Sequence, residues 1–277
     1  MNLIDRLFRD LRSRGDKAFM PFLTAGDPDL PATEKFVAHL VECGAHLVEL
    51  GFPYTDPIAD GPVIQASYTR ALAHGLHVDD VFASVRRLAD APALRSRGVP
   101  LVGMVSYSLV HRRRPDAFLR QAEAAGLSGL IVPDLPVEES AELVALGRAR
   151  DFKIIHLVTP TTPPARAVDI TRASSGFLYC VSVTGITGER DRLPEQLHEQ
   201  LAWLRQHTDL PLCVGFGVSR PEHVRLLRDV ADGIIVGSAL VKFLEEAKAR
   251  PAAAVAQPMG DLVRTLIAAL NPGTPPR

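Results

Sequence analysis

Three carboxylates stand close together in the segment VELGFPYTDPIADGP, residues 48–62. Glu49 lies inside the apolar run 45–51, which is typical of a strand buried on both faces. An ionised carboxylate in such a place is costly unless it is paired or neutralised. Burial would raise its pKa toward neutrality, which suits a group that gives and takes a proton at the carboxyl end of a barrel strand. We predict that Glu49 is a general acid/base, and a buried ion pair is the alternative.

The other two carboxylates follow in a proline-rich loop. Asp60 stands just before a helix predicted from Gly61 to Ala73, so it could be a helix N-cap with no part in catalysis. Asp56 taken alone is typical of a loop residue that faces water. The spacing from a strand end to a helix start nevertheless indicates a catalytic floor, formed by Glu49 and Asp60, under a loop that acts as a mobile lid.

Length and composition limit the class of protein. A chain of 277 residues fits either one large α/β barrel or two ordinary domains, and we favour one domain over residues 1–277. Its 47% hydrophobic and 23% charged residues are typical of soluble globular proteins, and a net charge of −1 gives no reason to expect nucleic acid or a membrane surface as partner. No apolar run approaches the ~20 residues of a membrane span. The N-terminal segment has no secretory signal, so we expect a cytoplasmic protein.

Cysteine and histidine give no sign of a metal site. Cys43, Cys180 and Cys213 are odd in number and widely separated, which indicates buried thiols in a reducing compartment rather than disulfides. The nine histidines form no pair with convincing metal-ligand spacing. We therefore predict no metal.

The carboxylates need a scaffold, and the chain offers a regular one. Apolar segments alternate with segments of helical periodicity, joined by short connections, and this alternation is typical of parallel α/β folds. Eight such segments predict a closed (β/α)8 TIM barrel, with a doubly wound open sheet as the weaker alternative. The predicted strands lie within residues 18–28, 45–51, 99–107, 128–134, 152–158, 176–183, 211–217 and 232–238.

Five further segments lie outside this repeat. An amphipathic helix over residues 2–14 precedes the first strand and could plug the bottom of the barrel. An extra short helix follows the eighth strand. Residues 248–258 resemble a loose Ala/Pro connection before a final helix at 259–270, and residues 271–277 are expected to be a frayed tail.

Turns of small residues follow the sixth, seventh and eighth predicted strands, at 185–188, 215–219 and 236–240. Glycine lets backbone N–H groups approach an anion, and the extra helix would add its positive end. Because this fold often binds phosphate beside strands 7 and 8, we predict a phosphate site that needs no Lys or Arg. The alternative is that the glycines only serve tight turns. The predicted phosphate-binding residues are Gly188, Gly217, Gly237 and Ser238.

Six motifs spread over almost the whole chain carry a family resemblance: PFLTAGDP (21–28), VELGFPYTDPIADGPVIQ (48–65), GLIVPDLPVEE (129–139), LYCVSVTGITG (178–188), VGFGVS (214–219) and GIIVGSALVK (233–242). Together they resemble the tryptophan synthase alpha subunit family. The resemblance implies a barrel lyase that cleaves indole-3-glycerol phosphate to indole and glyceraldehyde 3-phosphate. It implies no cofactor or metal for this half-reaction.

The resemblance also implies roles for the carboxylates. Glu49 would protonate C3 of the indole ring and assist loss of the glycerol hydroxyl proton, while Asp60 would hold the ring N–H and balance the positive charge. Thr187 matches the family residue that meets the aspartate when its loop closes over the substrate.

Three aromatic residues match the positions at which the family lines an apolar slot for the ring, although core packing is the usual role of any one aromatic residue. These residues are Phe22, Tyr179 and Phe216.

The loop 53–60, which contains Asp56, resembles the segment that faces the pyridoxal-phosphate-bearing beta subunit. The resemblance implies an αββα assembly in which indole passes to that partner, so pyridoxal phosphate is expected only on the beta subunit. One departure is present, because Ser108 stands where the family often carries an asparagine at the border of the partner interface. This departure affects the predicted signalling between subunits rather than the lyase chemistry.

Other functions are compatible with parts of this pattern. A stand-alone indole-releasing lyase would use the same carboxylates without a partner. A sugar-phosphate epimerase would need metal-binding His and Asp at several strand ends, and those are missing from the sequence. A catalytically idle subunit that only steadies a partner would not need Glu49 and Asp60.

Overall fold

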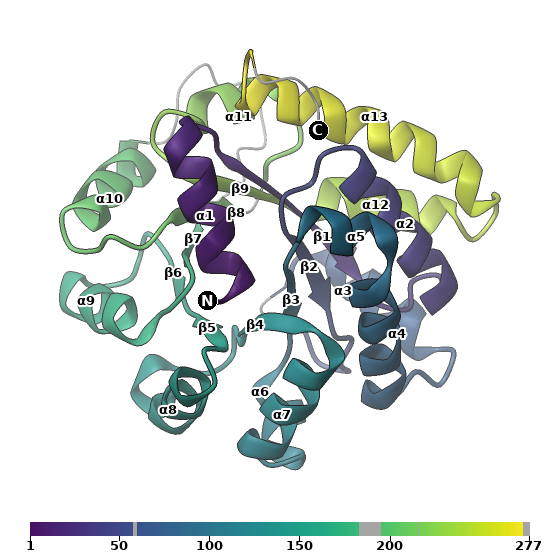
Figure 1. Cartoon of the computed structure of the whole chain (residues 1–277), viewed down its shortest axis with the longest axis horizontal. Coiled ribbons are helices and arrows are strands. Elements are labelled where there is room, and N and C mark those ends of the chain that lie inside the picture. The colour runs from purple at the N-terminus through teal and green to yellow at the C-terminus, as the bar shows by residue number, and fades with distance from the viewer. Residues whose placement is uncertain (58–59, 183–194, 216, 274–277) are drawn as a thin grey trace.

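The computed structural model describes residues 1–57, 60–182, 195–215 and 217–273. Within these ranges nine parallel strands form one sheet in the order β5-β4-β3-β2-β1-β9-β8-β7-β6. The two ends of this order, β5 and β6, follow each other in the chain with only His156 between them, so the sheet closes as a barrel (Figure 1). The strands are β1 (Ala18–Thr24), β2 (Val48–Gly51), β3 (Leu101–Met104), β4 (Leu127–Ile131), β5 (Lys153–Ile155), β6 (Leu157–Val158), β7 (Leu178–Val181), β8 (Leu212–Gly215) and β9 (Gly233–Val236).

This arrangement confirms the predicted TIM barrel, and the open-sheet alternative is wrong. The fifth predicted strand is split into β5 and β6, and each of the other predicted strands contains or overlaps one observed strand. The strands are short and almost wholly buried because helices cover their outer face and side chains fill their inner face.

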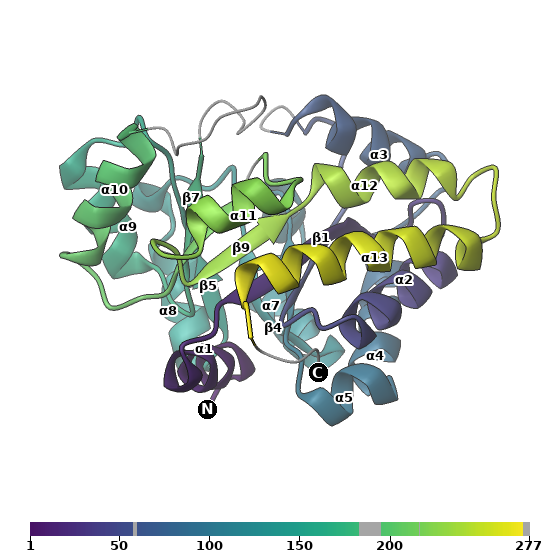
Figure 2. The same cartoon turned by 90° about the horizontal axis from the view of Figure 1, so that it is seen from above.

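Helices surround the sheet, and α13 runs along the outside of the barrel beside α2 and α12 (Figure 2). The helices are α1 (Leu3–Arg14), α2 (Leu30–Glu42), α3 (Pro62–Leu72), α4 (Val78–Asp90), α5 (Pro92–Arg97), α6 (Tyr107–Arg112), α7 (Pro115–Ala125), the 3-10 helix η1 (Val137–Glu139), α8 (Ala141–Ala149), α9 (Pro164–Ala173), α10 (Glu195–Arg205), α11 (Pro221–Leu227), α12 (Ser238–Glu246) and α13 (Ala252–Leu270). The predicted extra helix after the last strand is confirmed as α12.

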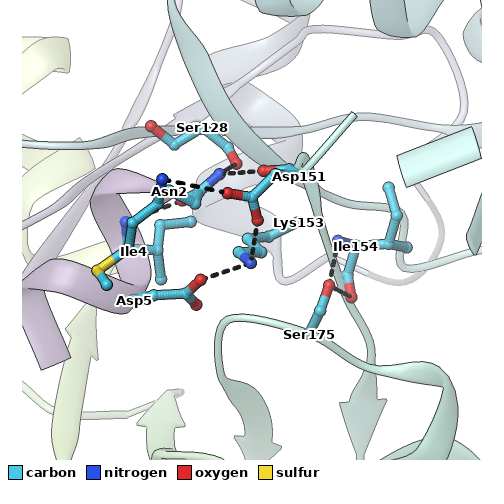
Figure 3. A network of polar contacts seen from close by, with 9 residues as sticks. Asn2, Ile4, Asp5, Ser128, Asp151, Lys153, Ile154 and Ser175 are labelled. Atoms are coloured by element: carbon cyan, nitrogen blue, oxygen red, sulfur yellow. Dashed lines mark hydrogen bonds and ion pairs between the residues drawn. The ribbon is translucent and has the colours of Figure 1, made fainter. Parts of the chain in front are cut away.

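Helix α1 lies over one end of the barrel (Figure 1), and residues at its N-terminal end contact the beginnings of β4 and β5 (Figure 3). The Asn2 side chain donates hydrogen bonds to the carbonyl oxygens of Ser128 (2.9 Å) and Asp151 (2.7 Å). Lys153, the first residue of β5, forms ion pairs with Asp5 (2.6 Å) and Asp151 (2.7 Å). These contacts confirm the predicted plug, so the opposite end of the barrel is the one left for a site.

The predicted end of the third strand was wrong. The strand stops at Met104, and α6 begins at Tyr107. Ser106 caps this helix by accepting a hydrogen bond from the Ser108 amide, and Asp134 accepts bonds from the Ser106 hydroxyl (2.7 Å) and the Tyr107 amide (2.8 Å). These bonds satisfy amides that a continuing strand would have paired with its neighbour.

The predicted loose connection at 248–258 was also wrong, because α13 starts at Ala252 and continues through Pro258. Val255 and Met259 are fully buried, and this burial stabilises the helix against the loss of one backbone hydrogen bond at the proline. Asn271, expected to begin a frayed tail, is buried and exchanges hydrogen bonds with the backbone of Lys17 (2.8 and 2.9 Å). Residues 274–277 lie outside the described residues.

Candidate active site

Glu49 lies on β2 with its carboxyl inside the barrel. It is paired in register with Phe22 of β1 and Val102 of β3, and residues paired in this way in parallel strands point to the same face. Its side chain is 1% exposed, and neither carboxyl oxygen has a hydrogen-bond partner among the residues that the structure describes. The buried ion pair considered from the sequence is therefore not formed within this part of the chain.

The surroundings of Glu49 change its acidity. Burial raises the pKa of the Glu49 carboxyl from 4.5 to about 8, and the charge of Asp60 adds to the increase. Glu49 is therefore mostly protonated at neutral pH, so it can donate a proton and later take one back.

Asp60 is not the N-cap of the following helix. Helix α3 begins at Pro62, its N-cap is Gly61, and no side chain caps it. The Asp60 carboxylate instead faces the Tyr54 hydroxyl at 3.5 Å. Burial raises the pKa of Asp60 to about 6, an increase that Tyr54 opposes. Near neutral pH the two groups thus differ, with Asp60 mostly an anion and Glu49 mostly a neutral acid.

A cavity of about 480 Å³ opens at the end of the barrel at which the strands finish. Six of the predicted residues line it together: Phe22, Asp60, Tyr179, Gly217, Gly237 and Ser238. The Tyr179 ring reaches into the barrel because Gly215 has no side chain, and a Cβ there would overlap the tyrosine hydroxyl. Glu49 is not in the lining of this cavity; it sits deeper on the inner face of β2, where burial and the Glu49 charge both raise the pKa of Tyr179.

One wall of this cavity has the features of an anion site. Helix α12 begins at Ser238, directly after β9, and its N-cap Gly237 leaves the first turn without a side-chain cap. Gly217 has a φ of +79°, which lets the β8–α11 loop turn beside α12. Uncapped amides at a helix N-terminus, joined by a glycine turn, favour a phosphate group.

Sequence reasoning missed part of the lining. Lys242, one helical turn after Ser238, belongs to the same cavity, although no basic residue was expected there. Its spacing from Ser238 on α12 was the available signal. Apolar residues that were also missed are Ile64, Met104, Ile235, Phe243 and Leu262. The predicted residues Thr187, Gly188 and Phe216 lie outside the described residues.

Asp56 and Ser108, the predicted interface residues, lie together on a second cavity of about 760 Å³. The loop after β2, helices α3, α4 and α6, and Asp134 contribute to its walls. Tyr54 connects the two cavities, because its ring lines the second one while its hydroxyl faces Asp60 at 3.5 Å. Across the described ranges, no group of three or more His, Cys, Asp or Glu side chains is arranged to hold a metal ion.

Known proteins of one family match the sequence of this chain over nearly its full length. Residues 8–268 match the family model described as tryptophan synthase alpha chain. The tryptophan synthase alpha chain of Rhodopirellula baltica is 47% identical over 278 residues, which cover 98% of this chain and 99% of that protein. The alpha chain of Synechocystis is 46% identical over 247 residues, covering 89% and 92% of the two chains.

Solved structures of tryptophan synthase chains have the same fold as this chain. The crystal structure of tryptophan synthase subunit alpha from Legionella pneumophila superimposes with a TM-score of 0.87 at 34% identity and covers 98% of both chains. A chain of tryptophan synthase from M. tuberculosis, in an aminoacrylate-bound form, gives a TM-score of 0.84 at 31% identity and covers 98% of this chain and 100% of that one.

Proposed function

Because the chain belongs to the tryptophan synthase alpha chain family, whose members cleave indole-3-glycerol phosphate to indole and glyceraldehyde 3-phosphate, we propose that Glu49 and Asp60 carry out this cleavage. The reaction is a carbon–carbon lyase step of tryptophan biosynthesis, a retro-aldol cleavage. The observation that best supports the assignment is the Glu49 carboxyl, which is buried and unpaired among the described residues beneath a cavity that contains a second carboxylate.

Different parts of the cavity bind the phosphate and the indole ring of the substrate. The phosphate binds to the amides at Gly217, Gly237 and Ser238, and Gly188 is proposed to add a further contact. Lys242 and Glu246 both line this cavity, and Glu246 is paired with Arg250 at 3.1 Å, so the Lys242 ammonium adds positive charge to the cavity. The cavity is large enough for a ligand of this size.

The indole ring lies in the apolar part of the cavity, between Phe22 and Tyr179. Phe216, which lies outside the described residues, is proposed from the family resemblance to contribute to the same slot. We propose that the ring N–H points toward Asp60 and C3 of the ring toward Glu49. Thr187 is proposed to meet Asp60 when its loop closes over the substrate.

The chemistry needs two proton transfers. Protonated Glu49 gives its proton to C3 of the indole ring, which makes C3 tetrahedral and the ring positively charged. Asp60 accepts the hydrogen bond of the ring N–H and balances that charge. Glu49, now ionised, takes the proton of the adjacent glycerol hydroxyl while the bond from C3 to the side chain breaks. Indole and the aldehyde are released, and Glu49 is protonated again.

We expect a bell-shaped dependence of kcat/KM on pH. Activity falls below about pH 6 because Asp60 becomes protonated, and above about pH 8 because Glu49 loses the proton that it must donate. The measurement is initial rates of indole formation by the purified chain over this range, with stability checked at each pH. A profile that stays level well above pH 8 would contradict the role of Glu49 as the proton donor.

We also propose an αββα assembly with a tryptophan synthase beta subunit that carries pyridoxal phosphate and receives the indole. The surface around Asp56 and Ser108 supports this proposal, because Tyr54 reaches from that surface to Asp60. The alpha chain itself is proposed to need no cofactor.

Indole formation from indole-3-glycerol phosphate, measured with and without a beta subunit, tests the function and the partnership together. Turnover should rise when the beta subunit is added. Equal rates in both samples would favour a stand-alone lyase, and no indole in either sample would favour an idle subunit.

A cytoplasmic location is proposed from the cysteines, since Cys43, Cys180 and Cys213 are all free and buried, as expected in a reducing compartment. None of the helices described here has the length and apolar character needed to cross a membrane.

A further inference from the structure

Tyr68 of α3 has a buried hydroxyl group that nothing in the described structure satisfies. The side chain is 1% exposed, and its hydroxyl has no hydrogen-bond partner among the described residues. A buried hydroxyl left unpaired costs free energy, so such a group in a folded protein calls for an explanation. The same is true of Glu49, whose two carboxyl oxygens are also unpaired in this part of the chain.

The hydroxyl lies directly beyond Glu49 on the inside of the barrel. Gly51 is two residues after Glu49 on β2, so it faces the same interior. A Cβ at Gly51 would lie 2.8 Å from the Tyr68 hydroxyl and 2.5 Å from the Phe22 ring. The tyrosine hydroxyl therefore occupies the space that a side chain at Gly51 would fill, next to a residue that lines the substrate cavity.

Asp60 is close to the same point. The Tyr68 and Tyr54 rings pack with their centroids 5.4 Å apart, and the Tyr54 hydroxyl faces Asp60. Burial raises the pKa of Tyr68 well above 10, and the charges of Asp60, Tyr54 and Glu49 act in the same direction. The hydroxyl thus keeps its proton and remains a hydrogen-bond donor within the electrostatic influence of both carboxyl groups.

Anchoring α3 does not require this hydroxyl. Ser67 and Arg70, its neighbours on the helix, bind Asp27 in the loop after β1 through a hydrogen bond of 2.5 Å and an ion pair of 2.6 Å. The Tyr68 ring packs in the hydrophobic core, and this packing does not depend on a hydrogen bond of the hydroxyl. The polar end of the side chain therefore has no structural role in holding α3 that the described residues show.

We propose that Tyr68 is a further catalytic residue, whose hydroxyl donates a hydrogen bond to the glycerol oxygen that Glu49 deprotonates. The inference rests on the proposed function. As the bond from C3 breaks, that oxygen becomes the aldehyde carbonyl, and negative charge develops on it once Glu49 has taken its proton. A donor on the other side of the oxygen stabilises this charge, and Tyr68 keeps its own proton throughout.

The test compares Tyr68→Phe with the wild-type chain in the cleavage of indole-3-glycerol phosphate, with Glu49→Gln assayed in parallel. Phenylalanine keeps the ring and removes only the hydroxyl, so the free energy of unfolding should be unchanged or higher. We expect kcat to fall about tenfold with little change in KM, because the hydrogen bond strengthens as charge develops. Tyr107→Phe is the matched control and should retain wild-type rates, because it removes the hydroxyl of a half-buried tyrosine on α6 whose ring packs against His111.

The outcomes separate this inference from the proposed function. If the wild-type chain forms no indole, or Glu49→Gln is as fast as wild type, the proposed function fails. If the wild type is active and Glu49→Gln is not, but Tyr68→Phe keeps a wild-type kcat, only the role of Tyr68 is overturned. A higher KM with unchanged kcat would equally overturn it, since the hydroxyl would then act on substrate binding alone.

Discussion

Glu49→Gln is expected to lower kcat for the cleavage of indole-3-glycerol phosphate by about 10²- to 10⁴-fold. Glutamine has nearly the same shape but cannot give or take a proton, and general acid/base catalysis contributes roughly this factor. Substrate binding should change little, because Glu49 is not in the lining of the cavity that holds most of the substrate contacts. Steady-state kinetics of indole release by the two purified chains is the measurement.

A control variant and a contradicting outcome define the test of this prediction. Glu139→Gln, an exposed residue of η1, is the matched control and should leave kcat unchanged. A Glu49→Gln chain that remains within about tenfold of wild type would rule out Glu49 as the proton carrier, since it would have lost less than such catalysis supplies.

The same substitution has a consequence for stability. The pKa of Glu49 is about 8 in the folded chain, against 4.5 for a glutamate side chain in water, so the folded state holds the proton more tightly. The raised pKa contributes to the free energy of unfolding. This contribution is fully present below about pH 4.5 and is lost as the pH rises through about 8. The free energy of unfolding of the wild type should therefore fall across this window relative to that of Glu49→Gln.

The second large effect concerns the anchor of α3. Arg70→Leu is expected to lower the free energy of unfolding by about 3–5 kcal/mol, because it leaves a buried carboxylate without its counter-ion. Asp27 is 0% exposed and receives hydrogen bonds from Arg70 Nε at 3.0 Å and Arg70 Nη2 at 2.6 Å. Denaturant-induced unfolding of both chains measures the difference.

An exposed pair of the same chemistry provides the control. Arg166 pairs with Glu138 at 2.9 Å, with the two side chains about half exposed, so Arg166→Leu should cost about 1 kcal/mol or less. The double variant Asp27→Asn with Arg70→Leu should recover part of the loss, because the unpaired charge is gone. Equal losses for Arg70→Leu and Arg166→Leu would show that the buried pair does not hold α3.

Much of this molecule could be predicted from the sequence because its strongest signals are local. Buried parallel strands are short apolar runs, so the barrel followed from their repetition. Glu49 stood out because it is an acid inside such a run. The glycine turns could be assigned to one wall of a site because the carboxyl ends of barrel strands meet at one face.

The features that could not be predicted from the sequence depend on contacts between segments that are distant in the chain. Residues 252–258 are rich in alanine and contain a proline, and only the burial of Val255 and Met259 decides in favour of a helix. By local rules Asp60 was a good N-cap for the following helix, but the helix begins after Gly61 and the fold turns Asp60 toward Tyr54 instead. Tyr68 looked like any core aromatic residue.

The same limit applies to the lining of the cavity. Leu262 lies on the last helix and reaches the site only through the packing of α13 against α12, which no local pattern indicates. That residues 1–277 form one domain stays a prediction, as do the catalytic, binding and interface roles of the site residues. Thr187, Gly188 and Phe216 lie outside the described residues.

The titration of the Glu49 carboxyl itself is the most direct measurement. Carbon-13 NMR of the chain labelled at its glutamate carboxyls, compared with the same spectrum of Glu49→Gln, isolates this one group. Its midpoint should lie near pH 8, as required of an acid stored in protonated form below the substrate. A midpoint near 4.5 would mean that Glu49 is ionised at neutral pH, and the acid that protonates the indole ring would have to be another group.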